Sequence, residues 1–167
     1  MTTSPESPRR DERPDLRILR DPVQFFALGF GSGLAPVAPG TFGSVVGLLV
    51  SLITARLGFP VEAIVALLAC VAGIWICGES AARLGVHDHP SIVWDEVAGM
   101  MITMLAAPPE WWGAILAFAL FRFFDIVKPW PIREIDHGMR GGIGIMLDDV
   151  VAGVMAAVVL MLMRALL

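Results

Sequence analysis

The chain has 167 residues and a net charge of −4; 56% of its residues are hydrophobic, 17% are charged, and mean hydropathy is +0.74. This is too apolar for an ordinary soluble domain, and the long uncharged runs exclude disorder, a collagen-like repeat and a multidomain enzyme. No stretch combines clustered Lys or Arg with interleaved aromatics, so nucleic acid is not expected as a partner. The composition predicts one membrane-embedded unit.

Residues 1–22 are predicted to form a charged, solvated tail. Ten charged residues lie between Glu6 and Asp21, among prolines at positions 5, 8, 14 and 22. Such a segment buries too little apolar surface to offset the entropy lost on ordering. The folded domain is therefore expected over residues 23–167.

Four or five apolar helices are predicted beyond the tail, over residues 42–57, 61–83, 92–107, 111–127 and 150–166. Thr41 or Ser44 is expected to cap the first of them. Helices of 16 to 18 residues reach only about 24–27 Å against a hydrocarbon core of roughly 30 Å, so crossing a thin bilayer and partial immersion both stay open. The predicted fold class is all-α, a compact membrane-embedded bundle.

Basic residues gather at one end of this bundle. They precede the first span and follow the second and the fourth; the set is Arg9, Arg10, Arg13, Arg17, Arg20, Arg83, Lys128, Arg133 and Arg140. The positive-inside rule predicts that this end faces the cytoplasm. Most remaining acids fall at the same end, and clustered ionisable groups at a membrane boundary indicate a functional site.

The first candidate motif is the glycine- and proline-rich segment 29–43, which leads into a helix. The unpaired N–H groups and positive dipole of a helix N-terminus favour an anion, so the turn at Gly40 and Thr41 is a candidate phosphate-binding element. A stiff loop that only packs explains the segment equally well. It matches neither a Walker A motif nor a dinucleotide fingerprint.

The second motif is the segment 86–97. His87 and His89 flank Asp88 in it, and two further acids, Asp95 and Glu96, follow in the first turns of an apolar helix. Such a group can bind a metal or relay protons. The alternative is that the acids merely complement the helix dipole. His-x-His alone is weak evidence for zinc, because no tetrahedral ligand set accompanies it.

The third motif is the segment 121–133, where Arg122, Asp125 and Lys128 form an alternating charge stripe on one helix face. A structural ion-pair stripe explains this pattern about as well as a site. Prolines at positions 129 and 131 end the helix, which directs Lys128 and Arg133 into the polar layer. These two cations are candidates to hold a lipid phosphate.

The fourth motif is the segment 141–150, a flexible glycine-rich entry that ends in Asp148 and Asp149 where the last apolar helix is expected to begin. Five carboxylates then share one depth: Asp95, Glu96, Asp125, Asp148 and Asp149. Clustered oxygen ligands suit Mg²⁺ or Ca²⁺, and Mg²⁺ commonly bridges carboxylates to a substrate phosphate. Phosphoryl transfer is the reaction class that these residues indicate.

A competing pattern is Cys77-x₅-Arg83, the spacing of cysteine-dependent phosphatases. That chemistry needs a strand–loop–helix cradle and a thiolate of low pKa. Here the run continues an apolar helix, and Glu79 would oppose ionisation of the thiol. The pattern is therefore kept only as an alternative.

Taken together in chain order, the four motifs resemble the phosphatidylglycerophosphatase A family of bacterial membrane enzymes, from about Leu28 to Val154. The resemblance implies an all-helical fold, Mg²⁺ dependence, and hydrolysis of the phosphomonoester of phosphatidylglycerophosphate at the cytoplasmic face of the inner membrane. The family's acidic positions correspond to Asp88, Asp95, Glu96, Asp125, Asp148 and Asp149, with His87 and His89 in the same layer.

The mechanism expected from this resemblance has Mg²⁺ held by several of the five clustered carboxylates. His87 or His89, oriented by Asp88, would serve as general base or acid. Lys128, Arg133 and the N–H groups around Gly40 and Thr41 would hold the phosphate. The alternatives are a non-catalytic helical membrane protein with a structural cation and a cysteine-dependent lipid phosphatase; the oligomeric state is not determined by the sequence.

Overall fold

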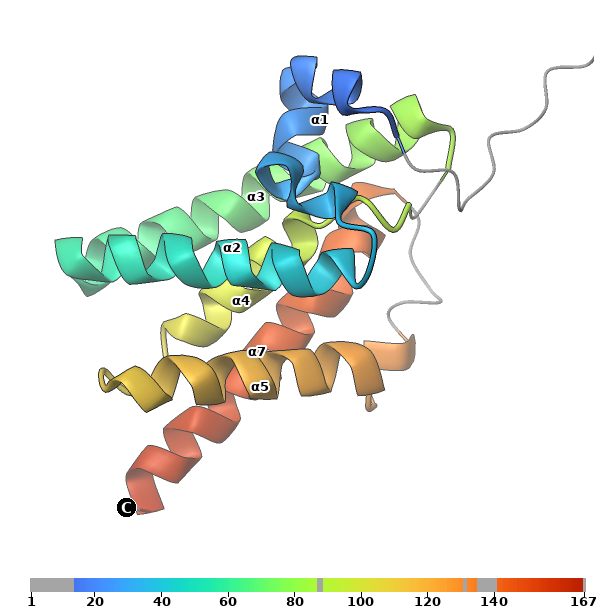
Figure 1. Ribbon diagram of the computed structural model, residues 1–167. Helices are drawn as coiled ribbons and strands as arrows, with labels where there is room; N and C mark the ends of the chain where they lie inside the picture. Colours follow the sequence, from blue (N-terminus) through green and yellow to red (C-terminus); the bar gives the residue numbers. More distant parts are fainter. Residues whose placement is uncertain (1–13, 87–88, 131, 135–140, 167) are drawn as a thin grey trace, which may run out of the picture.

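The computed structural model describes residues 14–86, 89–130, 132–134 and 141–166, and within these ranges the chain is helical without strands. The long helices are α2 (Pro39–Thr54), α3 (Phe59–Leu84), α4 (Trp94–Met104), α5 (Trp111–Val127) and α7 (Gly142–Leu166) (Figure 1). Shorter elements are η1 (Leu16–Arg20), α1 (Pro22–Ala27), η2 (Gly29–Leu34) and η3 (Ala55–Leu57). The all-α prediction is confirmed.

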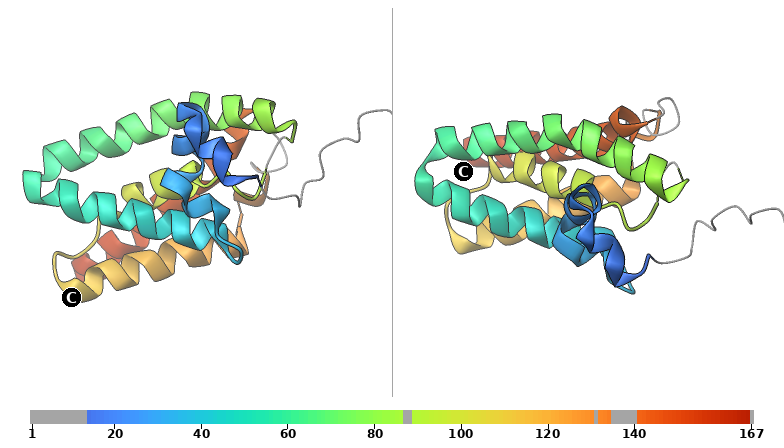
Figure 2. Two further views of the ribbon diagram at one scale, coloured as in Figure 1. Left: turned by 45° about the horizontal axis from the view of Figure 1, so that its top comes forward. Right: turned by 90° about the horizontal axis from the view of Figure 1, so that it is seen from above.

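Helix α4 is the centre of the bundle. It packs against α2, α3, α5 and α7, and most of its side chains are buried. Figure 2 shows the other long helices arranged around it. Because successive helices run in alternating directions, α2 and α4 begin where α3 and α5 end. This end of the bundle therefore collects the segments that the sequence analysis singles out.

Among the described residues, three segments are long and apolar enough to cross a membrane: Pro39–Leu57, Phe59–Leu84 and Gly142–Leu166. Their outer surfaces carry large apolar side chains; Leu67, Leu68 and Val71 of α3 are each at least 60% exposed. Helix α4 has only 11 residues, which is too short to cross, so its neighbours bury it instead. The membrane-helix character of the prediction is confirmed.

Glycines set the closest helix approaches. A Cβ on Gly47 of α2 would lie 2.5 Å from the carbonyl oxygen of Val97 in α4, and one on Gly153 of α7 would lie 2.4 Å from the carbonyl oxygen of Gly99 in α4. Small residues at crossings let helix backbones approach closely within a membrane. At these crossings α2 and α7 therefore pack directly against the backbone of α4.

The starts of α2 and α7 differ from those predicted. Helix α2 begins at Pro39 with Ala38 as its N-cap residue, and the hydroxyl of Ser44 donates instead to the carbonyl of Gly40 at 2.8 Å. Helix α7 begins at Gly142, not at residue 150, so Asp148 and Asp149 lie within it. The glycine-rich entry is helical because its missing Cβ atoms let α7 pack on α3; a Cβ on Gly142 would lie 1.7 Å from the carbonyl oxygen of Ile74.

Part of the segment predicted as a solvated tail is helical. Residues 16–20 form η1, and Asp21 caps α1 by accepting a hydrogen bond from the N–H of Val23 at 2.9 Å. Asp21 also pairs with Arg83 of α3. These contacts anchor the segment, which composition alone does not reveal.

Candidate active site

A polar cavity of about 580 Å³ opens at the end of the bundle where α2 and α4 begin and α5 ends. Four helices and two adjoining loops contribute to its walls. The lining residues are Ala38, Pro39, Gly40, Pro90, Ile92, Asp95, Glu96, Arg122, Asp125, Ile126, Lys128, Asp148 and Asp149. All five carboxylates proposed from the sequence as metal ligands therefore line one cavity.

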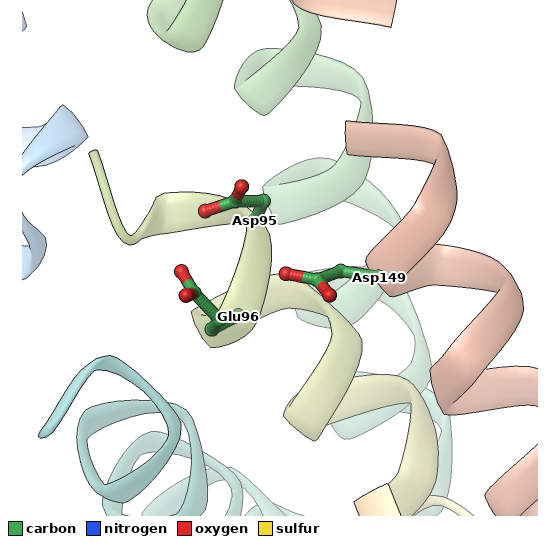
Figure 3. Close-up of side chains that lie close together, drawn as sticks. All are labelled: Asp95, Glu96 and Asp149. Carbon is green, nitrogen blue, oxygen red and sulfur yellow. The ribbon is translucent and has the colours of Figure 1, made fainter. Parts of the chain in front are cut away.

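Three of these carboxylates form a compact group. Asp95 and Glu96 are the second and third residues of α4, and Asp149 reaches them from α7 (Figure 3). One carboxylate oxygen from each lies within 4.8 Å of the others, a spacing that allows them to share a metal ion. Asp95 is 9% exposed and Asp149 is 3% exposed, so water screens these like charges poorly.

The electrostatics of this group favour the binding of a cation. Burial and the neighbouring Glu96 and Asp149 carboxylates raise the pKa of Asp95, and burial raises the pKa of Glu96 to about 7. Oδ1 of Asp95 and Oε2 of Glu96 are buried without a hydrogen-bond partner among the described residues. Buried hydrogen-bond acceptors of this kind need a partner. Carboxylate oxygens are also the ligands that hard divalent cations prefer.

The other two predicted ligands are each paired with a cation. Asp125 accepts a hydrogen bond from Arg122 one turn earlier on α5. Oδ2 of Asp148 accepts one from Nζ of Lys128 at 2.7 Å. The structure brings all five carboxylates together, but the assignment of Asp125 and Asp148 as metal ligands stays a prediction.

Two of the four predicted substrate-binding residues line the cavity and two do not. Gly40 and Lys128 line the cavity, whereas Thr41 is half-buried beside it and Arg133 is exposed outside the lining set. A Cβ on Gly40 would lie 2.1 Å from Oε1 of Glu96, so a larger residue at position 40 would displace this carboxylate.

Among the predicted catalytic residues, His89 is buried beside the cavity and its neighbour Pro90 lines it. Nδ1 of His89 accepts a hydrogen bond from the N–H of Ser91 at 3.1 Å, which orients the ring. His87 and Asp88 lie outside the described residues. The catalytic role assigned to this segment stays a prediction.

Arg122 is a site residue that the sequence does not predict. Its spacing indicates only a charge stripe, but its side chain lines the cavity and is 16% exposed. Its Nη1 contacts Asp125 and lies 3.4 Å from Oγ of Ser44 in α2. The spacing of Arg122 and Asp125 was the available signal, but spacing does not show which neighbouring helix an arginine reaches.

The cysteine-dependent alternative lacks the required geometry. Cys77 is 0% exposed within the uninterrupted helix α3, and its sulfur lies 3.7 Å from that of Met146. Arg83 is paired with Glu79 and Asp21 rather than with the thiol. Cys77 and Arg83 therefore do not form a phosphate cradle.

The fold and the site define a helical membrane protein with a buried carboxylate centre. Residues 25–164 match the family described as Phosphatidylglycerophosphatase A, and the chain belongs to this family. No solved structure matches the chain.

Similar proteins include two with the name Phosphatidylglycerophosphatase A. The Escherichia coli K12 protein is 43% identical over 92% of this chain and 90% of its own length. The Haemophilus influenzae protein is 48% identical over 84% of this chain and 88% of its own length. A Bacteroides thetaiotaomicron protein is 41% identical over 81% of this chain and 89% of its own length, and its name proposes a phosphatidylinositol-3-phosphatase.

Proposed function

We propose that this chain is a Mg²⁺-dependent lipid phosphatase that hydrolyses the phosphomonoester of phosphatidylglycerophosphate to phosphatidylglycerol and inorganic phosphate. The observation that carries the proposal is the convergence of Asp95, Glu96 and Asp149 in a polar cavity of a membrane bundle. Membership of the family and the names of the two relatives above support the substrate.

The donor set fits Mg²⁺. Asp95, Glu96 and Asp149 would hold the ion, since each offers a carboxylate oxygen and two of these residues have a buried oxygen without another partner. When bound, Mg²⁺ supplies a Lewis acid for a phosphate oxygen and lowers the pKa of a bound water. Asp125 and Asp148, which line the same cavity, are the candidates for further ligands.

The surrounding residues orient the substrate and move protons. Lys128, at the end of α5, holds phosphate oxygens next to Asp148, and the N-terminal turn of α2 at Gly40 and Thr41 offers backbone N–H groups. Arg133 follows α5 and is proposed to attract the anionic headgroup from outside the cavity. His87 or His89, oriented by Asp88, acts as general base for water or general acid for the leaving oxygen.

The site is proposed to face the cytoplasm across the bacterial inner membrane. Arg17 and Arg20 of η1 and Arg83 at the end of α3 lie at the cavity end of the bundle, as does Lys128 at the end of α5. Arg56 follows α2 at the other end. This bias favours the cavity end as the cytoplasmic one and gives the site access to an anionic phospholipid in that leaflet.

Phosphate release from defined lipids by the purified chain tests the proposal. Phosphatidylglycerophosphate, phosphatidylinositol 3-phosphate and phosphatidic acid are compared in detergent micelles with Mg²⁺ and with EDTA. We expect Mg²⁺-dependent release, fastest from phosphatidylglycerophosphate. Faster release from phosphatidylinositol 3-phosphate would overturn the substrate assignment, and saturable Mg²⁺ binding without release from any lipid would favour a structural cation.

A further inference from the structure

Arg122 is held in the cavity from two sides. Its Nη1 contacts Asp125 on its own helix and lies 3.4 Å from Oγ of Ser44 on α2. The Ser44 hydroxyl is itself fixed, because it donates to the carbonyl of Gly40 at 2.8 Å and is fully buried. The guanidinium is therefore set in position before any substrate arrives.

The guanidinium retains unused donor capacity. Nε of Arg122 is buried and has no hydrogen-bond partner among the described residues. The same cavity holds two buried acceptors in the same condition, Oδ1 of Asp95 and Oε2 of Glu96. A metal cation would satisfy the two carboxylate oxygens, and a phosphate bound to that cation would satisfy the guanidinium N–H. A phosphate oxygen is a strong acceptor for a guanidinium N–H.

Arg122 is better placed for this role than the two cations predicted from the sequence. Lys128 is engaged with Asp148 at 2.7 Å, and its side chain is 30% exposed. Arg133 is exposed and does not line the cavity. Arg122 also lies beside the metal-binding group, because a Cβ on Gly40 would lie 2.1 Å from Oε1 of Glu96 and 3.3 Å from Nη1 of Arg122.

We infer that Arg122 is a further residue that binds the nonbridging oxygens of the phosphate undergoing hydrolysis, in addition to Lys128 and the N–H groups of α2, and that Ser44 is the positioning residue for its guanidinium. This inference rests on the proposed function for the identity of the lipid substrate. The ligand chemistry, a phosphate group next to a divalent cation, is independent of which lipid carries the phosphate.

The test measures binding of inorganic phosphate, the proposed product, which does not depend on turnover. The full chain in detergent with saturating Mg²⁺ is titrated with phosphate, and the rise in unfolding temperature gives an apparent Kd. Arg122→Lys keeps the charge but loses the planar fork, and we expect it to weaken phosphate binding by about 10- to 100-fold. Arg56→Gln, at the other end of the bundle, is the control and should leave the Kd unchanged.

A titration with Mg²⁺ separates this role from a structural one. If Arg122 binds phosphate, the Mg²⁺ concentration that gives half of the thermal shift without phosphate stays near the wild-type value in Arg122→Lys. If Arg122 only positions Asp125, that concentration changes and the phosphate Kd does not. The second result would overturn the inference.

Ser44→Ala keeps the test usable if Arg122→Lys does not fold. It removes a buried hydroxyl without changing any charge, and we expect a smaller loss of phosphate affinity with unchanged Mg²⁺ binding. A wild-type chain that shows no phosphate-dependent shift would overturn the inference, as would an unchanged phosphate Kd in both variants. Failure of the proposed function would give a different result: the chain would still bind inorganic phosphate but would release none from the lipids.

Discussion

Gly99 of α4 and Gly153 of α7 lie backbone to backbone at the point where the two helices cross. A Cβ on Gly153 would lie 2.4 Å from the carbonyl oxygen of Gly99, and the hydroxyl of Thr103 lies 3.3 Å from the carbonyl oxygen of Gly153. Asp149 is one turn before Gly153, and Glu96 is just under one turn before Gly99. The close crossing is therefore what brings the carboxylates of the two helices together.

Gly153→Ala should separate α4 from α7 and reduce both stability and activity. Because a methyl group cannot fit against a backbone carbonyl, the cost of overpacking is expected to be about 1–3 kcal/mol. The apparent Mg²⁺ affinity should fall as well, since Asp149 moves away from Glu96. Thermal unfolding and Mg²⁺ titration check this, with Val154→Leu on the half-exposed neighbouring position as the control. A fully active, equally stable Gly153→Ala protein would contradict the role of this crossing.

Asp149→Asn should nearly abolish turnover while it stabilises the metal-free protein. The substitution removes a proposed ligand, but it also removes a buried negative charge that lies within 4.8 Å of Asp95 and Glu96. Loss of that repulsion should raise the free energy of unfolding in EDTA by about 1–4 kcal/mol at pH values above 7, where Glu96 is ionised. Phosphate release and unfolding in EDTA measure the two effects.

Asp95→Asn and Asp125→Asn should also lose nearly all turnover, with membrane insertion intact. The exposed Glu110→Gln serves as the charge-matched control. Near-normal rates in all three aspartate variants would reject the metal assignment.

The stability of the metal-free protein should fall as pH rises. Burial raises the pKa of Glu96 from 4.5 to about 7, so the folded chain holds more protons than the unfolded chain between these values. Since the folded state is favoured where it binds the extra proton, the unfolding temperature in EDTA should decrease across this window. Glu96→Gln should show a shallower decrease and Glu110→Gln the wild-type one. An unfolding temperature that rises with pH would contradict the direction of this shift.

Cys77→Ala should retain near-wild-type activity, and thiol alkylation of the folded chain should leave it unchanged. The sulfur is 0% exposed and packs against Met146, so Cys77→Ala removes a core contact and not a nucleophile that substrate could reach. EDTA should stop the same reaction. Inactivation by Cys77→Ala, with the protein still folded, would restore the cysteine-dependent alternative.

Helix type and approximate position could be predicted from the sequence because long apolar runs leave few other structures in a membrane. The range 111–127 predicted for α5 agrees with the structure. The start of α7 was missed because glycines are typical of both flexible entries and close helix contacts, and only the position of Ile74 on α3 distinguishes the two at Gly142. Composition predicts a tail for the residues up to Pro22 for a similar reason, since Arg83, the partner of Asp21, is far away in the chain.

The sequence by itself determined the chemical character of the site: acids and bases at the ends of apolar helices, in the order that the family shares. Only the tertiary structure decided which of them meet. Asp95, Glu96 and Asp149 form one group while Asp125 and Asp148 pair with Arg122 and Lys128. The physical reason is that charge type is local to a residue, whereas the distance between two carboxylates depends on how closely their helices cross, and glycines such as Gly99 and Gly153 set that distance.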